Sequence, residues 1–593
     1  MEKFYDYYTK EMKEDTLPEG NEYDFLLERN KNHMNDTALS FDTKKISYEE
    51  LHERIDEFAR ALYKRGIHKD TKVGVVVVNT PESVYLLYAL KKLGAQVIGL
   101  SPLNNEYKMQ RDIEMTKPEF IISVDMMHGN FKNLAKSLNI TPILYSPLES
   151  LDKNGLKFLY NAKQLLAGNK ILKKDNNLMS IVADGKDYID VEYPKHVKGT
   201  TTDIMFTGGS SGVHKGVDLD GGALNSVVKA LDYVLILEPG MVHLGNIPFG
   251  HMCFGRLVLH YALCKNLEYA LTLKALPKDF YSELVRTHAN GAMGGPVHWE
   301  ILAQDPSLKQ WTLENLIQPL SGGEMFKPQK LKEANKALEY AGCITPIGNG
   351  LGLTEMWAPT HVCLGGKNTP GTIGYPIPFV NSKIADPKTF EDMPLETPGV
   401  LLVNGPGMML RYHENEAETN AVFVYDENGV KWYNTKDVAI KHENGEYEFV
   451  GRVKRNFVSG VDNIYPEQIE QILLQIPEIR EVIVTSIPDD KEQFLPSYHV
   501  SLNNFNCDRK VLEDKIFTFV DDSTTILSKD VSELKGINLT INGANNTFDV
   551  NNKDFLSSVN ENQNVTISNI NITNNNDEAT DNKGILNLNN VKS

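Results

Sequence analysis

Asp203-Ile-Met-Phe-Thr-Gly-Gly-Ser-Ser-Gly-Val-His-Lys-Gly-Val217 is the stretch from which the rest of the chain is best interpreted. An apolar strand leads into a loop of glycines and hydroxyl residues, and a lysine follows. Glycines let backbone N–H groups crowd around an anion, while Thr207, Ser210 and Ser211 add donors and Lys215 adds positive charge. The segment therefore predicts a phosphate-binding loop. The alternative is a plain turn rich in glycine and serine.

This loop is not a Walker loop. That motif needs Gly-Lys followed by Ser or Thr, whereas Lys215 here follows His214 and precedes Gly216. Any phosphate site in this segment has to belong to another class of nucleotide-binding protein.

The segments that precede the loop alternate between helix and strand patterns. Ser47 and Glu50 form a capping box before a helical pattern at 51–62, and 81–93 reads as a second helix. The apolar run 73–78 reads as a strand buried on both faces, and the segment 96–100 reads as another strand. The pattern predicts an α/β fold with a mainly parallel sheet and helices on both of its faces.

The chain changes composition near residue 524. From Thr524 to Ser593 there are 18 Asn in 70 residues, no Trp or Tyr, and only two Phe. Short alternating strands ended by Asn or Gly occur in 536–550, 564–576 and 584–590. Repeated short strands of this kind predict a β-solenoid-like tail, and the alternative is a disordered polar tail.

Composition excludes several classes of function. The chain has 593 residues, 41% hydrophobic, with 61 Lys and Arg against 79 Asp and Glu, a net charge of −18. This balance disfavours a nucleic-acid partner. No apolar run is long enough for a membrane span, and the acidic start does not resemble a secretory signal. Five scattered cysteines without metal-ligand spacing indicate a reducing, cytoplasmic location.

The glycine-rich segment resembles the phosphate loop of the AMP-forming adenylating enzymes, which include acyl- and aryl-CoA synthetases, peptide-synthetase adenylation domains and luciferases. The family pattern is (Thr/Ser)-Ser-Gly-(Ser/Thr)-Thr-Gly-x-Pro-Lys-Gly. Its positions fall here on Thr207, Gly208, Gly209, Ser210, Ser211, Gly212, His214, Lys215 and Gly216. Gly208 stands for Ser, Ser211 for Thr and His214 for Pro.

Further segments resemble other family motifs, in the family's order. The resemblance implies a wall of the acyl pocket at His251, an adenine-side turn at Gly323 and Glu324, and a nucleotide-binding strand at Asn349, Gly350 and Leu351. It implies that Thr354 faces the phosphate, that Glu355 holds Mg²⁺, and that Asp437 binds the ribose. Arg452 falls in the segment like the hinge that precedes the family's mobile C-terminal domain. The motifs are Pro248–Gly255, Ser321–Glu324, Asn349–Glu355, Tyr433–Asp437, Gly451–Lys454 and Ser459–Glu470. For His251 the alternative is a packed core histidine.

The sequence also departs from the family pattern. Leu351 stands where the family has an aromatic on adenine, Lys436 replaces a glycine beside Asp437, and Val461 replaces a glycine on the pantetheine path. The family's C-terminal lysine motif, which bridges carboxylate and α-phosphate, has no counterpart in 521–593. The resemblance therefore implies slow adenylation. The tail instead resembles adhesin-like parallel β-helix proteins, whether by natural fusion or by rearrangement.

These observations predict three parts: a large adenylate-forming α/β domain over 1–450, a partial α+β mobile domain over 451–520, and the tail over 521–593. The expected activity is that of an AMP-forming acid:CoA ligase. It would use ATP and Mg²⁺ to make an acyl-adenylate from a carboxylic acid and then transfer the acyl group to CoA. One alternative is an amino-acid-activating domain that serves a carrier-protein thiol. Another is a catalytically impaired nucleotide-binding protein with a β-solenoid interaction tail. The expected partners are therefore a carboxylic acid and a thiol of CoA or of a carrier protein. No nucleic-acid partner and no membrane span are expected.

Overall fold

The chain forms two compact units, each described here by itself. In a computed structural model of the chain, one unit holds Met1–Lys383, Leu402–Thr435 and Lys441–Glu448, and the other holds the rest. The structure describes residues 15–127, 135–138, 140, 142–151, 154–166, 176–207, 215–363, 369, 371–453, 455, 457–459, 462–474, 476, 478–488, 494–502, 538–549, 558–559, 564–573, 581–582 and 585–592.

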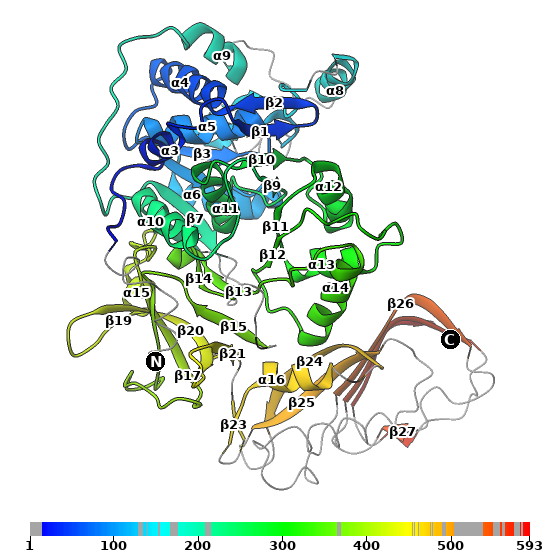
Figure 1. Cartoon of the computed structure of the whole chain (residues 1–593). Helices are drawn as coiled ribbons and strands as arrows, with labels where there is room; N and C mark the ends of the chain where they lie inside the picture. The colour runs from blue at the N-terminus through cyan, green and yellow to red at the C-terminus, as the bar shows by residue number, and fades with distance from the viewer. Residues whose placement is uncertain are drawn as a thin grey trace. The chain divides into compact units, whose positions relative to one another are not determined.

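A seven-stranded sheet in the first unit carries the predicted loop (Figure 1). Its order is β18-β8-β7-β4-β3-β5-β6, parallel from β7 to β6 and antiparallel where β8 meets β7 and β18. The strands are β3 (Lys72–Val76), β4 (Gln96–Gly99), β5 (Phe120–Val124), β6 (Ile143–Tyr145), β7 (Asp203–Thr207), β8 (Lys215–Leu219) and β18 (Arg411–Tyr412). The sequence prediction of an α/β fold is confirmed.

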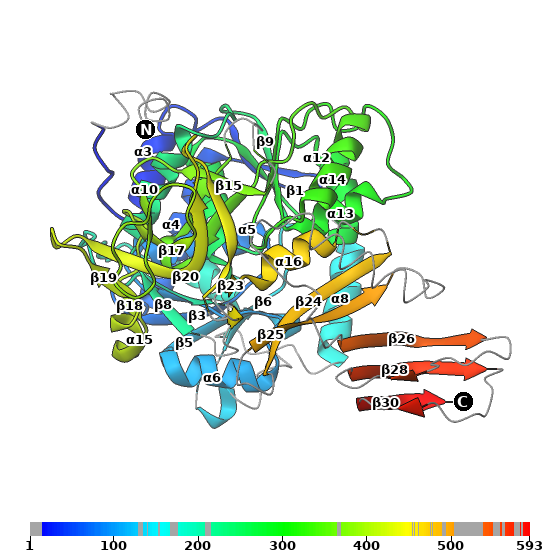
Figure 2. The ribbon, with the colours of Figure 1, turned by 90° about the horizontal axis from the view of Figure 1, so that it is seen from below.

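A six-stranded sheet, β12-β11-β9-β10-β1-β2, forms the second layer of this unit. It is parallel except where β2 turns back on β1. The strands are β1 (Thr37–Phe41), β2 (Lys44–Ser47), β9 (Val242–Gly245), β10 (Glu268–Leu271), β11 (Gly291–Gly294) and β12 (Gln318–Ser321). Helices α12 (Phe280–Thr287), α13 (Pro296–Ala303) and α14 (Pro328–Tyr340) lie together (Figures 1 and 2), beside β11 and β12 in Figure 1. Phe280 and Trp299 pack edge to face there in a buried apolar cluster.

Antiparallel strands follow along the chain. β13 (Gly350–Leu353) pairs with β14 (Ala358–Val362), β14 with β15 (Thr372–Pro376), and β15 with β21 (Tyr447–Arg452). β19 (Phe423–Tyr425) pairs with β20 (Lys431–Lys441). The strands β16 (Asn381–Ala385), β17 (Gly399–Asn404), β20 and β21 are each divided between the two units.

The helices begin where the sequence offers caps. Ser47 accepts from the backbone N–H of Glu50 at the start of α4, and Thr80 caps α5, whose first residue is Pro81. The helical elements are α3 (Glu22–Asn30), α4 (Tyr48–Lys64), α5 (Pro81–Lys92), α6 (Glu106–Thr116), η1 (Asp125–Met127), α8 (Asn154–Leu166), α9 (Leu178–Gly185), α10 (Gly221–Asp232), α11 (Cys253–Cys264), η3 (Pro277–Asp279), α12 (Phe280–Thr287), α13 (Pro296–Ala303), α14 (Pro328–Tyr340), η4 (Thr354–Met356), α15 (Glu416–Asn420) and α16 (Pro466–Leu473). In the part of the chain that the structure describes, no helix is both long and apolar enough to cross a membrane.

A buried cluster of four charged side chains ties distant segments of the first unit together. Lys91 Nζ lies 3.1 Å from Glu22 Oε1 and also pairs with Asp203. Arg256 lies 3.8 Å from Glu22 and 3.6 Å from Asp203. All four side chains are at most 2% exposed. Two cations and two anions therefore neutralise each other where water is excluded.

The second unit contains a small α/β element. β22 (Phe457–Ser459) pairs with β23 (Asp462–Ile464), and β24 (Ile479–Pro488) pairs with β25 (Phe494–Leu502). Apolar residues of β23, α16, β24, β25 and the segment between α16 and β24 form a buried cluster: Ile464, Ile469, Leu473, Ile476, Ile479, Val482, Val484, Tyr498 and Val500. Val461 lies outside the described residues. The domain boundaries at 450 and 520 stay predictions.

Three strands of the tail pair in parallel. β26 (Asn538–Asp549) lies beside β28 (Asn564–Thr573), and β28 lies beside β30 (Ile585–Lys592), with Ile541, Ile567 and Leu588 in one register. The short strands β27 (Ser558–Val559) and β29 (Asp581–Asn582) also pair in parallel. The assignment of this tail to a β-solenoid stays a prediction.

Candidate active site

The two strands that flank the glycine-rich loop bring its ends together. Thr207 is the last residue of β7 and Lys215 is the first of β8, and the two lie opposite each other in the antiparallel ladder. The predicted phosphate-loop residues Gly208, Gly209, Ser210, Ser211 and Gly212 lie outside the described residues.

Lys215 contacts two side chains that come from a later segment of the chain. Its ammonium lies 2.5 Å from Oε2 of Glu418 and 4.5 Å from the centre of the Tyr412 ring. The lysine side chain is 20% exposed. The predicted phosphate-loop cation is thus partly withdrawn from water and held between a carboxylate and an aromatic face.

Glu355 occupies the same neighbourhood. The Tyr412 hydroxyl donates a hydrogen bond of 2.8 Å to Glu355 Oε1, and it lies 3.2 Å from the hydroxyl of Tyr433. Burial, together with the nearby Glu355 carboxylate, raises the pKa of Tyr412 well above its ordinary value, so Tyr412 stays a donor at neutral pH. The structure therefore brings Lys215 and Glu355, predicted from separate motifs, to one tyrosine.

Tyr412 and Glu418 were missed by the sequence analysis. Tyr412 reaches the site because β18 pairs with β8, with Tyr412 opposite Val217. A strand of two residues leaves no periodic signal in the sequence. Only the family order of motifs could have drawn attention to this segment, and it contains no motif that the analysis used.

Thr354 lies at the start of η4, directly before Glu355. Its carbonyl oxygen is 3.9 Å from the Cys253 sulfur at the start of α11, and the backbone N–H of Met409 donates to the Glu355 carbonyl. These contacts fix the backbone of the Thr354–Glu355 pair from two sides.

The predicted adenine-side residues form two adjacent segments. Gly323 has a φ of +88°, a left-handed conformation that glycine adopts without strain, and the exposed Glu324 follows it. The backbone N–H of Ser321 donates to the Gly348 carbonyl, which places this turn next to the segment that contains Asn349. The structure therefore brings these two motifs together.

Gly350 and Leu351 begin β13, and Leu351 lies opposite His361 of β14. A Cβ added at Gly350 would lie 2.7 Å from the His361 carbonyl oxygen, so this position has no room for a side chain. Leu351 is half-buried. An aliphatic side chain can contact an aromatic base there but cannot stack on it as a second ring would.

His251 lies in the loop after β9, near the carboxyl end of β4. A Cβ added at Gly99 would lie 3.0 Å from the His251 Cα. Burial lowers the pKa of His251 to about 4, so the ring is neutral at physiological pH. Its Nδ1 is buried and has no hydrogen-bond partner among the described residues. The choice between a pocket histidine and a core histidine stays open to experiment.

Asp437 and Arg452 belong to the second unit, and they pair with each other. Arg452 Nε lies 2.6 Å from Asp437 Oδ1, and the Asp437 side chain is fully buried while Arg452 is 39% exposed. Lys436, directly before Asp437, has a φ of +60°. The family glycine at this position is therefore replaced by a lysine in a left-handed conformation, which costs about 1–2 kcal/mol.

The Glu355 carboxylate fits Mg²⁺ that enters together with a nucleotide. In the described ranges, no group of three or more His, Cys, Asp or Glu side chains could hold a metal ion. Mg²⁺ commonly takes one or two protein carboxylates, with water and substrate phosphates completing its shell. One carboxylate beside a phosphate-loop lysine matches that mode of binding.

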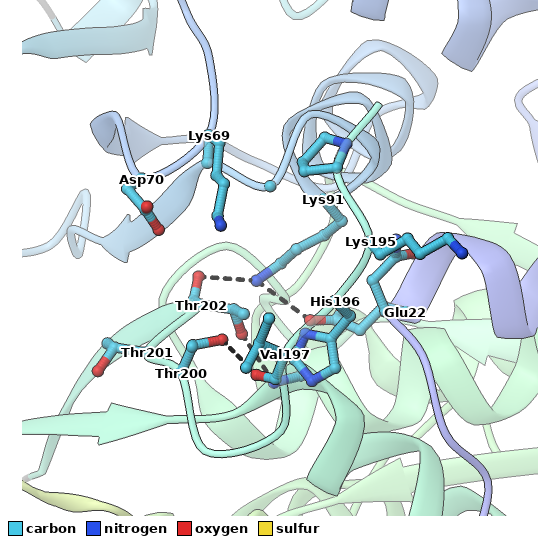
Figure 3. A pocket seen from close by; sticks show the side chains of 15 residues that line it. Glu22, Lys69, Asp70, Lys91, Lys195, His196, Val197, Thr200, Thr201 and Thr202 are labelled. Carbon is cyan, nitrogen blue, oxygen red and sulfur yellow. Dashed lines mark hydrogen bonds and ion pairs between the residues drawn. The ribbon is translucent and has the colours of Figure 1, made fainter. Parts of the chain in front are cut away.

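A cavity of about 40 Å³ lies at the opposite end of β7, around Thr202, and is separate from this site (Figure 3). Thr202 directly precedes β7, five residues before Thr207, so the cavity lies about 17 Å from Thr207 along the strand. Lys91 lines it but already contacts Thr202 and Glu22, as the dashed lines show. The cavity borders the buried charge cluster and not the predicted phosphate loop.

Known proteins resemble this chain along most of its length. A long-chain-fatty-acid–CoA ligase of Bacillus subtilis is 25% identical over 465 residues, covering 76% of this chain and 80% of that protein. Luciferin 4-monooxygenase of Photinus pyralis is 25% identical over 494 residues, covering 82% and 84%. The solved structure of a benzoate CoA ligase from Burkholderia xenovorans matches the fold with a TM-score of 0.71 at 17% identity, covering 88% of this chain and 96% of that one.

A family model described as AMP-binding enzyme matches residues 26–413, which is more than half of the chain and includes Thr207, Lys215, His251, Glu355 and Tyr412. Together with the meeting of the phosphate-loop lysine and the η4 glutamate at one tyrosine, this match shows that the chain belongs to the AMP-binding enzyme family.

Proposed function

We propose that this protein is an AMP-forming acid:CoA ligase. It activates a carboxylic acid with MgATP to an acyl-adenylate and pyrophosphate, and it then transfers the acyl group to the thiol of CoA. The observation that carries the proposal is the placement of Lys215 and Glu355 on the ring and hydroxyl of Tyr412. The CoA-ligase names among the similar proteins support the same reaction.

The chemistry explains why these side chains are needed. A carboxylate attacks the α-phosphate of ATP, so two anions must approach each other. Lys215 supplies a cation, and the N–H groups and hydroxyls of the 207–212 loop supply donors that offset this charge. Glu355 would hold Mg²⁺, which offsets phosphate charge when it is bound. Tyr412 fixes the Glu355 carboxylate through its hydrogen bond.

The remaining predicted residues take supporting roles in this proposal. Thr354 faces the phosphate, and Gly323, Glu324, Asn349, Gly350 and Leu351 line the adenine. His251, whose ring burial keeps neutral, lines the acyl pocket. Asp437 accepts from the ribose hydroxyls, for which it must share or leave its contact with Arg452.

In this proposal the adenylation step is slow, because the tail stands where the family has its bridging lysine. No segment of 521–593 carries the family's bridging lysine motif. Loss of one such cation at the reacting oxygens costs roughly 10²–10³-fold in rate, by analogy with loss of one oxyanion donor. A family-type C-terminal segment grafted after residue 520 should raise pyrophosphate release. We also propose that the protein is cytoplasmic and that the tail forms a short β-solenoid.

Pyrophosphate release with a panel of acids tests the proposal. Aliphatic and aromatic acids without an α-amine should support release and yield an acyl-CoA by mass spectrometry. Release that occurs only with amino acids, with the acyl group passed only to a carrier-protein thiol, would identify an amino-acid-activating domain. Nucleotide binding without release for any acid would indicate an impaired nucleotide-binding protein.

A further inference from the structure

Glu418 is held against Lys215 by a short, well-connected helix. The Asn415 side chain accepts from the backbone N–H of Glu418 at 3.1 Å. The Thr419 hydroxyl donates to the Asn415 carbonyl at 2.7 Å and accepts from the backbone N–H of Tyr412 at 3.0 Å. The position of Glu418 is therefore fixed by the backbone of α15 as well as by its ion pair.

The ion pair is not one on which stability depends. The side chains of Lys215 and Glu418 are 20% and 43% exposed. Ion pairs with this much access to water contribute at most about 1 kcal/mol. Because the ion pair contributes little to stability, we consider a role for Glu418 in ligand binding.

Among the described residues, the charges that gather at Tyr412 add up to a net negative value. Lys215 lies over the ring, Glu355 accepts from the hydroxyl, and Glu418 lies near enough to raise the pKa of Tyr412. One cation is thus set against two carboxylates. A bare polyphosphate that approaches Lys215 meets Glu418 already bound there, and it meets the charge of Glu355 as well.

We propose that Glu418 neutralises Lys215, so that the phosphate site rejects metal-free polyphosphates and accepts a polyphosphate that carries a divalent cation. This inference rests on the proposed function, because it assumes that Lys215 binds nucleotide phosphate. A divalent cation removes this repulsion of polyphosphates, since it pairs with Glu355 and lowers the negative charge of the phosphates. An ammonium has three donors, so Lys215 can keep Glu418 while it contacts a phosphate oxygen.

Nucleotide binding to the full chain tests the proposal through Glu418→Gln, which keeps the shape of the side chain and removes its charge. Calorimetry measures ATP with EDTA, ATP with excess Mg²⁺, and AMP. Glu418→Gln should tighten the binding of metal-free ATP by about 10-fold or more, because the charge of Lys215 is then no longer neutralised by a carboxylate. The affinity for MgATP should change by less than about 3-fold, because the metal ion already offsets the phosphate charge. Glu416→Gln, an exposed position on the same helix, is the matched control and should match the wild type.

A second comparison shows whether Glu418 acts through Lys215. In a Lys215→Ala background, Glu418→Gln should lose most of its effect on metal-free ATP. An undiminished effect would mean direct repulsion of the nucleotide and would overturn the neutralisation. An equal change for metal-free ATP and MgATP, or no change for either, would also overturn it. Pyrophosphate release by the wild type is measured separately, and its absence alongside intact ATP binding would contradict only the proposed ligase function.

Discussion

The Tyr412 hydroxyl donates to Glu355 across a distance of 2.8 Å, while the face of the same ring supports the Lys215 ammonium. One side chain therefore positions both charged groups that the proposed reaction needs. Tyr412 comes from a two-residue strand near the end of the matched family segment. Changes at Tyr412 should affect the metal and the phosphate together.

Tyr412→Phe should weaken the affinity for Mg²⁺ without abolishing the fold. Loss of a hydrogen bond to a metal-ligating carboxylate typically costs 10–100-fold in metal affinity. Titration of Mg²⁺ at fixed ATP, followed by nucleotide binding, should show the half-saturating concentration rise by about 10-fold or more. Tyr425→Phe, at a residue that is 65% exposed, is the control. An unchanged titration would remove Tyr412 from the metal site.

Lys215→Ala should weaken ATP binding by a charge-assisted contact, about 1.5–3 kcal/mol. This corresponds to roughly 10- to 150-fold in the dissociation constant, measured by calorimetry with Mg²⁺ present. Lys330→Ala removes a lysine from an exposed ion pair on α14 and should have no effect. Equal binding and equal pyrophosphate release in Lys215→Ala and the wild type would contradict a phosphate contact.

Lys91→Met should destabilise the first unit strongly, because it leaves Glu22 and Asp203 buried with Arg256 as their one cationic partner among the described residues. Removing one partner from a buried ionic group costs about 3–5 kcal/mol. Denaturant unfolding measures the loss. Lys45→Met breaks an exposed pair with Glu268 and should cost less than about 1 kcal/mol. Similar losses in the two variants would show that the buried cluster is not well paired.

Stability should fall as the pH drops from 7 to 5. Burial lowers the pKa of His52 and His243 to about 4, and that of His361 to about 3. The unfolded chain takes up protons near its ordinary value of about 6.5, so stability is full above that pH and is lost as the pH falls toward 4. Each such histidine contributes up to about 2 kcal/mol of this loss at pH 5.

His361→Gln should reduce the slope of unfolding free energy against pH, whatever its effect at pH 7. His33→Gln, at a half-exposed position, provides the comparison. If the two variants and the wild type share one slope between pH 7 and 5, then the buried rings do not drive the acid sensitivity.

Truncation after residue 520 should leave the melting temperature and ATP affinity of the main body unchanged within error. The tail differs in composition from everything before it, with 18 Asn among its last 70 residues. A solenoid of two or three coils has uncapped ends and adds little stability of its own. A fall of several degrees would show that the tail packs on the synthetase body and that the predicted boundary is wrong.

The sequence predicted local structure well where one pattern repeats over a whole element. The helix expected at 81–93 is α5 at Pro81–Lys92, and the strand expected at 73–78 is β3 at Lys72–Val76. The strand was predicted two residues too long, because Val77 and Val78 continue the apolar run after the ladder has ended. An apolar run indicates which residues avoid water, and it does not indicate which of them pair in the strand ladder.

Contacts between distant segments could not be predicted in the same way. The sequence indicated Asp437 and Arg452 as separate ligand contacts, whereas the structure pairs them at 2.6 Å. Replacement of a glycine by Lys436 was visible in the sequence, but its consequence, a lysine at a φ of +60°, needed the structure. No sequence pattern distinguishes Glu418 from other glutamates. Its role depends on its ion pair with Lys215, some two hundred residues earlier, and that contact is visible only in the structure.

The buried charge cluster also has a consequence for synthesis of the chain on the ribosome. Of the four residues Glu22 is made first and Arg256 last, so the cluster cannot be completed until synthesis has reached Arg256. At 5–20 residues per second this interval lasts about 12–47 s, during which unpaired charges keep α3 from settling into an apolar environment. Helix α3 is thus synthesised well before α11 and must wait for it. A nascent chain stalled before Arg256 should expose it to chaperones and proteases.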